Sequence, residues 1–539
     1  MEFCLVFFSK IIYIYLCYYR SMNNNLQMVY TYHNETKHAP SRYARSLGYM
    51  DWATQPDPYR SYIGAKQIEL PLSFDNNTIA YKDIFDLSKT ETAPLCIESI
   101  SQFFQFSLGH AAIKTYQGQS WALRCNASSG NLQPSESYIV SNDIEGLEDG
   151  LYHYGVKNHH LEFLSNTKEK LEIPKDSFIV GLSSIVWREA WKYGERSWRY
   201  TQLDCGHAYK ALEISAKILG WDIQILDVSD EDISSLLGFD DIKRYVPEES
   251  EKADMLLLVS KGTSTQTIDI QNLRDSLQDK YSGDANVLSA SRHNWEILEK
   301  IENAVSSESN TFSLAKSEAN DLRVCEYESK EIVLKRRSAQ VMNKNDATIS
   351  KNEFETILSS IVSKENIPVN LVLFVHSVEN LPSGLYILLG DKTKKEEMQT
   401  SMKELFLWEK VNSKVDDLYL LQGGDFKHIA KTISCDQDIA AHGAFSLGML
   451  VEFDKQLQEQ GAHRYKELYW NCGAIGQQLY LEATSLHLSA TGIGCFLDDI
   501  LHDVMGLKNS LYQSLYHFTI GRALVDSRLT NEEPYRDRS

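Results

Sequence analysis

Two short segments that lie far apart in the sequence carry residue types suited to holding a ligand. Residues 126–134 have the sequence Asn-Ala-Ser-Ser-Gly-Asn-Leu-Gln-Pro, whose small side chains let the backbone approach a flat ring. Residues 335–340 have the sequence Lys-Arg-Arg-Ser-Ala-Gln, which places two guanidinium groups beside a hydroxyl. Arginine forks and hydroxyls supply directional donors that match a phosphate. The two segments therefore predict a site that holds a flat ring and a phosphate.

A third segment carries residues that could move a proton. Lys192 and Tyr193 are neighbours in a Trp-Lys-Tyr-Gly-Glu-Arg run. Oxidation of a C–H bond by hydride transfer also needs a base to remove a proton, and a Tyr or a Lys of lowered pKa can serve. The same dipeptide could equally be structural, on a partly exposed helix. His207 is a weaker candidate, because a histidine that begins a packed helix is more often structural.

An internal repeat indicates which elements position these residues. Residues 143–152 end in Gly-Leu-Tyr and return as residues 377–386, and each copy follows a β-rich run, at 137–140 and 369–375. Repetition of a strand, a turn and a second strand predicts two related domains.

A second match follows in each half. Cys205-Gly206 and Cys472-Gly473 each head a segment with apolar residues at i, i+4, i+8 and i+11. This spacing predicts a helix that buries one stripe, and the small residues at its start allow close packing or close approach to a ligand. We expect an α+β fold of two tandem domains. Because most homo-oligomers are two-fold dimers, the domains should form an intramolecular pseudo-dimer.

The chain divides into five expected parts. These are a non-native or anchor segment at 1–27, an extended N-terminal arm at 28–64 lying over the first domain, domain 1 at 65–262, a linker with an inserted helix at 263–330, and domain 2 at 331–539. The apolar run 3–19 is interrupted by Lys10 and is short for a membrane span. It predicts either a signal anchor or a stretch upstream of a start at Met22 or Met28, and the missing cleavage site favours the second.

Composition excludes several classes of function. A chain of 539 residues is too long for one hydrophobic core, and a net charge of −20 argues against nucleic acid as a partner. The nine cysteines are scattered singly, without the C-x-x-C pair that would indicate zinc or a dithiol redox motif. We therefore expect no metal and a reducing, cytoplasmic compartment. Four of them lie in apolar or glycine-rich runs that predict small buried hydrophobes: Cys125, Cys205, Cys472 and Cys495.

Together these segments resemble the nitroreductase-like flavoprotein superfamily, in particular its SagB/thiazole-oxidase-type dehydrogenases, from about residue 30 to residue 528. The resemblance implies that FMN lies between two α+β units, with its phosphate held by one unit and its ring covered partly by the other. A tandem chain would supply both sides itself. Each half lacks a motif that the other has, so we predict one flavin rather than two.

The resemblance also implies roles for individual residues. Residues 336–340 resemble the family's Arg-x-Ser-x-Arg/Lys phosphate motif with a glutamine as the last residue, and residues 127–131 resemble its Pro-Ser-Ser-x-Asn loop with alanine as the first. Residues 492–494, Gly-Ile-Gly, resemble the backbone segment beside the flavin. The implied cofactor-binding residues are Arg124, Ser128, Ser129, Asn131, Arg336, Arg337, Ser338, Gln340, Ile493, Gly494 and Arg528. Arg337 or Arg528 would compensate for the neutral Gln340, and Lys192 and Tyr193 are the implied catalytic pair.

These matches imply an FMN-dependent oxidoreductase. It would be a dehydrogenase that transfers hydride between flavin and a small or peptide-derived substrate, such as an azoline ring, beside peptide-modification partner proteins. An NAD(P)H-dependent nitroreductase-type reductase is an open alternative. A non-catalytic relative that binds a peptide or partner and has lost flavin is another, which Gln340 and Ala127 favour.

Overall fold

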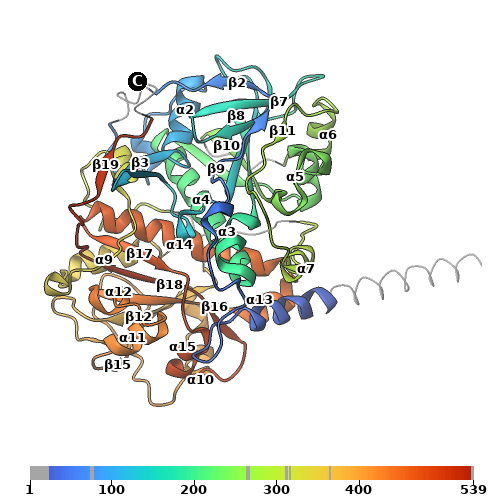
Figure 1. Ribbon diagram of the computed structural model, residues 1–539. Helices are drawn as coiled ribbons and strands as arrows, with labels where there is room; N and C mark the ends of the chain where they lie inside the picture. Colours follow the sequence, from blue (N-terminus) through green and yellow to red (C-terminus); the bar gives the residue numbers. More distant parts are fainter. Residues whose placement is uncertain are drawn as a thin grey trace, which may run out of the picture.

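Two seven-stranded antiparallel sheets form the body of the chain (Figure 1). The computed structural model describes residues 23–72, 78–262, 267–309, 314, 317–362 and 366–535. The apolar run 3–19 lies outside the described residues. Among the helices that are described, none is both long enough and apolar enough to cross a bilayer.

The first sheet has the strand order β2-β7-β6-β5-β8-β10-β9. Its strands are β2 (Lys66–Glu69), β5 (Ser135–Ser141), β6 (Gly150–Gly155), β7 (His160–Asn166), β8 (Ser177–Ser184), β9 (Trp221–Ile225) and β10 (Lys252–Lys261). The helices of this half are α2 (Ile97–Gln105), α3 (Val186–Tyr193), α4 (Ser197–Ile218), α5 (Asp230–Leu237), α6 (Ile270–Asp275) and α7 (Glu296–Ala304). Two small sheets flank it: β3 (His110–Tyr116), β4 (Gln119–Arg124) and β19 (Thr530–Glu532), and the pair β1 (Tyr62–Ile63) and β11 (Asp284–Ala285).

The second sheet has the order β14-β15-β13-β12-β16-β18-β17. Its strands are β12 (Val369–Val375), β13 (Gly384–Leu388), β14 (Glu409–Lys410), β15 (Leu418–Gly423), β16 (Phe445–Glu452), β17 (Ser489–Ile493) and β18 (Tyr512–Gly521). Its helices are α8 (Ser329–Lys335), α9 (Lys351–Ser359), α10 (Lys395–Ser401), α11 (Lys427–Ile433), α12 (Ile439–His442), α13 (Phe453–Gln460), α14 (Arg464–Ser485) and α15 (Asp498–Met505). Six neighbouring strands follow one another in the same relative order in both sheets, which confirms the predicted α+β fold of tandem domains.

The repeated Gly-Leu-Tyr motif has a structural cause. In both halves the strand that contains it has a register shift between the Leu and the Tyr, against β7 in one half and β15 in the other. The shift turns the tyrosine so that Tyr152 donates to the carbonyl of Glu148, and Tyr386 donates in the same way to Pro382, at 2.7 and 2.6 Å. A bulge re-aims a side chain in this way, so the repeat records a shared local geometry.

The two longest helices, α4 and α14, cross between the sheets and join the halves (Figure 1). A Cβ added at Gly206 would overlap the backbone of Trp470, and a Cβ at Gly473 would overlap the carbonyl oxygen of Leu203. The Cys-Gly pairs were predicted to begin these helices. Instead both Cys-Gly pairs lie inside the helices. α4 begins at Ser197, and its first residues are bulky and do not belong to the apolar stripe from which the helix was predicted. The glycines serve helix packing.

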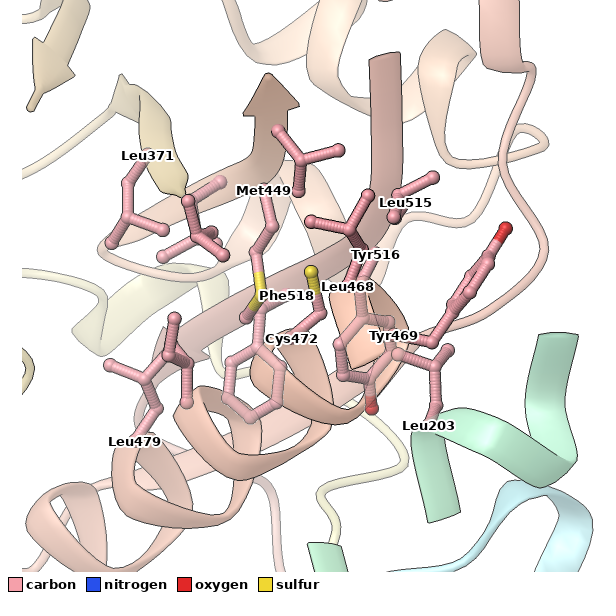
Figure 2. Packing of buried hydrophobic residues seen from close by; sticks show 14 of the residues in the cluster. Leu203, Leu371, Met449, Leu468, Tyr469, Cys472, Leu479, Leu515, Tyr516 and Phe518 are labelled. Carbon is pink, nitrogen blue, oxygen red and sulfur yellow. The ribbon is translucent and has the colours of Figure 1, made fainter. Parts of the chain in front are cut away.

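Apolar residues of α14 on the side away from α4 pack onto the second sheet. Figure 2 shows Cys472 and Leu479 beside Met449 of β16 and Phe518 of β18, all of them buried in one cluster. Further clusters lie on the other faces of both sheets, so each sheet is covered on two sides. This rigid packing fixes the loops that leave the sheet edges at the domain interface.

The N-terminal arm agrees only in part with the extended segment that was predicted over the first domain. Arg60 and Tyr62 contact Glu251 and Tyr138 of the first half, whereas the start of the arm is helical. Residues 23–35 form a helix that lies against the second half (Figure 1). Val29, Tyr32 and His33 are buried, and the two ring nitrogens of His33 hydrogen-bond Tyr465 and Gln513 at 3.0 Å. Burial of one helical stripe on a neighbouring domain overrides the weak pattern in the sequence. The predicted linker contains α7 where a helix was expected, and also α6 and β11.

Candidate functional site

A cavity of about 510 Å³ lies between the two halves and takes its walls from both. Its size falls in the range of small-molecule sites. The residues predicted from the sequence that line it are Arg124, Ser128, Ser129, Asn131, Tyr193, Arg336, Arg337, Ser338, Gln340, Ile493 and Gly494. Lys192 and Arg528 do not line it. Arg528 is exposed, and its guanidinium pairs with Asp526 at 2.8 Å, so it does not compensate for Gln340 at this cavity.

The loop 127–131 forms one wall, and both domains hold it in place. The backbone N–H of Ala127 donates to Gln477 of α14 at 3.1 Å, and Ser129 donates both its N–H and its hydroxyl to the Asp204 carboxylate of α4. Gly130 has a φ of 59° and Asn131 has a φ of 58°, a left-handed region that favours glycine and asparagine. The loop is thus pre-formed.

Lys192 and Tyr193 pack directly behind this loop. A Cβ added at Gly130 would lie 2.7 Å from the Tyr193 hydroxyl and 3.1 Å from Lys192 Nζ. A larger residue at 130 would displace the ends of these two side chains and would have to adopt the left-handed φ of 59°. Tyr193 therefore faces the cavity, whereas Lys192 lies against the loop.

Arg336 is the most unusual cation of the cavity. It caps α8, is 4% exposed, and donates from Nε to Cys125 O at 2.7 Å and from Nη2 to Arg124 O at 3.1 Å. Within the described part of the chain, its buried Nη1 has no hydrogen-bond partner and no carboxylate contributes to its electrostatic surroundings. Burial lowers its pKa. The guanidinium carbon lies 5.1 Å from the centre of the Tyr480 ring, which compensates the charge only in part. A buried charge without an anionic partner is costly, so this guanidinium favours an anionic ligand.

Two more cations lie at the same end of the cavity. Arg337 donates to the carbonyls of Leu334 and Ala111, and burial together with Arg336 lowers its pKa to about 10. Lys114 of β3 also lines the cavity, and burial and the two arginines lower its pKa. Sequence reasoning missed Lys114, because nothing near it in the sequence marks it. A phosphate would relieve the mutual repulsion of the three cations.

The arginine segment and the Gly-Ile-Gly segment lie side by side. Ser338 forms a parallel bridge with Ala490 of β17, and its hydroxyl is 2.8 Å from that of Tyr480. The Tyr480 hydroxyl also accepts from the N–H of Gly492 at 2.8 Å. A Cβ at Gly492 or at Gly494 would overlap a tyrosine ring or hydroxyl, so both glycines are needed for packing beside the cavity.

Asp204 is a titratable group of the cavity that sequence reasoning missed. It is buried on α4, and desolvation raises the pKa of its carboxyl to about 7 although Ser128 and Ser129 hydrogen-bond it. Burial and nearby acidic groups raise the pKa of Tyr193 well above its usual value. The phenol therefore stays protonated at neutral pH and donates, and Asp204 is better suited to accept a proton. A lone Asp before Cys205 carried no signal in the sequence.

His207 is held as a structural group, although it lines the cavity. Its Nδ1 is 3.2 Å from Gln477 and its Nε2 is 3.1 Å from the Tyr516 hydroxyl. Burial lowers its pKa to about 3, so the imidazole is neutral at physiological pH.

The titration of Asp204 predicts how stability depends on pH. The pKa is about 7 in the folded chain and about 4 in the unfolded chain. Between these values only the unfolded state has lost the proton, so wild-type stability falls as pH rises through this window and stays lower above it. Asp204→Asn removes this pH-dependent loss of stability, and the amide oxygen of the new side chain can still accept a hydrogen bond from Ser129. Its thermal midpoint relative to wild type should therefore rise between about pH 5 and about pH 8; a constant difference would contradict the assignment.

Comparisons with known proteins show what the chain is similar to in sequence and fold. Residues 333–522 match the model of the nitroreductase family. The trifolitoxin-processing protein TfxB of Rhizobium leguminosarum bv. trifolii is 30% identical over 171 residues, which cover 28% of this chain and 46% of TfxB. The chain thus spans less than half the length of that curated relative. A solved structure of a candidate nitroreductase from Anabaena variabilis matches with a TM-score of 0.65 at 20% identity, over 92% of this chain and 99% of that one.

Proposed function

We propose that this chain, which is nitroreductase-like in sequence and in fold, is an FMN-dependent oxidoreductase with one flavin site in the cavity between its halves. The observation that carries the proposal is the buried guanidinium of Arg336, which lines the cavity together with Lys114, Arg124 and Arg337 and whose Nη1 has no hydrogen-bond partner among the described residues. Arg188 and Arg323 are also buried with one unpartnered donor, but each pairs with a carboxylate, whereas no ion pair of Arg336 is found among the described residues. A dianionic phosphate is the ligand that this end of the cavity fits.

The two ends of the cavity match the two parts of FMN. Arg336, Arg337 and Lys114 would hold the phosphate, and Ser338 would add a hydroxyl. Lys114 takes the place of the second cation that Gln340 does not supply. The pre-formed loop 127–131 and the segment 492–494 would flank the ring from opposite domains. When bound, FMN supplies the hydride chemistry.

The chain's own residues would position the reactants and handle the proton. Asp204 holds the loop through Ser129, and its pKa of about 7 lets it accept and return a proton near neutral pH. Tyr193 would donate a hydrogen bond into the cavity from its phenol, since its raised pKa keeps the phenol protonated. Lys192 supports the loop from behind, so we propose a positioning role for it.

We further propose that the substrate is peptide-derived and that partner proteins present it. The support is the likeness to TfxB, which is named for processing trifolitoxin. A dehydrogenase that oxidises a heterocycle such as an azoline ring accords with a proton acceptor beside a flavin site.

Titration with FMN tests the proposal directly. We expect the purified full chain to take up one FMN per chain, seen as flavin absorbance that stays with the protein through gel filtration. Because the two arginines of the phosphate end and the ring loop come from different halves, the stoichiometry should be one and not two. Folded protein that takes up no FMN would favour the non-catalytic alternative, and two flavins per chain would contradict a single asymmetric site.

A further inference from the structure

Two cysteines from distant parts of the second domain meet at the edge of the cavity. Cys435 follows α11 and Cys495 follows β17, and their sulfurs are 2.7 Å apart. A disulfide bond is about 2.05 Å long, so the two sulfurs are nearly at bonding distance. Cys495 also lines the cavity. The sequence predicted a buried structural cysteine at 495 and no dithiol, because the partners are not neighbours in the chain.

The exposure of this pair differs from that of most other cysteines. Cys435 and Cys495 are both partly exposed, whereas four other described cysteines are buried: Cys125, Cys205, Cys325 and Cys472. Cys96 is partly exposed as well but lies elsewhere, at the start of α2. A small molecule that enters the cavity can therefore reach the sulfur of Cys495.

The surroundings of Cys495 favour its thiolate. The backbone N–H of Ala44 donates to His38 Nδ1 at 3.0 Å, which leaves the proton of the neutral ring on Nε2 for a hydrogen bond to Cys495. The Cys435 thiol, His38 and the guanidinium of Arg196 together lower the pKa of Cys495 to about 5. The same proximity raises the pKa of Cys435. The sulfur of Cys495 is thus an anionic nucleophile and that of Cys435 is a protonated thiol, which is the arrangement that thiol–disulfide exchange requires.

We propose that Cys435 and Cys495 are a redox-active dithiol that reduces low-molecular-weight disulfides entering the cavity. The Cys495 thiolate attacks one sulfur of the disulfide, which forms a mixed disulfide and releases one thiolate. Cys435 then loses its proton and attacks Cys495 Sγ, which forms the Cys435–Cys495 disulfide and releases the second thiol. Two electrons pass from the dithiol to the substrate, and the proton of Cys435 leaves with a product thiol. A low-molecular-weight thiol reverses the sequence.

The first test measures the reactivity of the individual thiols in the full chain without added FMN. At about pH 6 a thiol of pKa about 5 is mostly thiolate, and its lower intrinsic nucleophilicity offsets part of that gain. We expect iodoacetamide to modify Cys495 about tenfold faster than Cys96, measured by peptide mass spectrometry. Equal rates at Cys495 and Cys96 would contradict the proposed nucleophile.

The second test uses glutathione buffers of defined ratio, followed by acid quenching, alkylation and mass spectrometry. Wild-type protein should form the Cys435–Cys495 disulfide as the buffer becomes oxidising. Cys435→Ser should instead accumulate a mixed disulfide with glutathione at Cys495, whereas Cys495→Ser should form none at Cys435. Cys96→Ser is the matched control and should behave as wild type. If both thiols stay reduced in oxidised glutathione while the protein stays folded, the proposal is wrong, whether or not the chain binds FMN.

Discussion

Replacing Arg336 with Ala is expected to lower the affinity for FMN by roughly 10- to 100-fold. A charge-assisted hydrogen bond contributes about 1.5–3 kcal/mol. Among the described residues Nη1 has no hydrogen-bond partner, so its bond to the phosphate would replace no bond within the protein. The change also frees the carbonyls of Arg124 and Cys125, which Arg336 ties across the domain interface. FMN titration by fluorescence quenching measures the affinity, and circular dichroism checks the fold.

Three control variants separate phosphate binding from structural damage. Arg336→Lys keeps the charge without the fork, so it should recover part of the affinity. Lys114→Met leaves the interface untouched and should weaken FMN binding by roughly tenfold, since it removes one cation from the phosphate end. Arg528→Ala lies outside the cavity and should bind FMN as wild type. Arg336→Ala protein that is folded and keeps its affinity would overturn the assignment of the phosphate end.

The fold was predictable because its main signals are periodic and repeated. The β-rich run at 369–375 is the strand β12. The Gly-Leu-Tyr repeat marks a bulge whose geometry depends on a few neighbouring residues, so duplication preserved it in both halves. Local patterns of this kind can be recognised in a single sequence.

The candidate site was predictable only where its residues are contiguous. The loop 127–131 and the segment 336–340 are short runs, and the structure places both on one cavity. Lys114 and Asp204 reach the same cavity from a strand and from the middle of a helix. Their roles depend on burial and on charges supplied by distant segments, which no spacing in the sequence records.

The cysteine pair shows the same limit in another form. A search for C-x-x-C finds dithiols whose sulfurs approach through one helical turn. Cys435 and Cys495 approach because α11 and β17 end at the same corner of the second domain. Residues 38–44 of the N-terminal arm then cover that corner through His38. The arm was expected over the other domain, so its part in setting the thiol chemistry could not be inferred.

Gly473→Ala is expected to destabilise the chain although it places a better helix former inside α14. Helix propensity alone favours alanine over glycine by about 1 kcal/mol. At this position, however, the new Cβ would overlap the carbonyl oxygen of Leu203 and lie 3.0 Å from Gly206 Cα. Both contacts are backbone atoms of α4, so relief requires the two helices to move apart.

Whether Gly473→Ala lowers or raises the thermal midpoint decides whether packing against α4 or helix propensity dominates at this position. Overpacking of this kind costs about 1–3 kcal/mol, and the upper part of this range exceeds the gain in propensity. A net loss of about 2 kcal/mol should lower the thermal midpoint by roughly 4–8 °C. Gly423→Ala is the matched control, because a Cβ there meets no atom within 4 Å. Since the cavity takes its walls from both halves, Gly473→Ala should also weaken FMN binding. A midpoint equal to or above that of wild type would mean that the crossing of α4 and α14 is not held by these glycines.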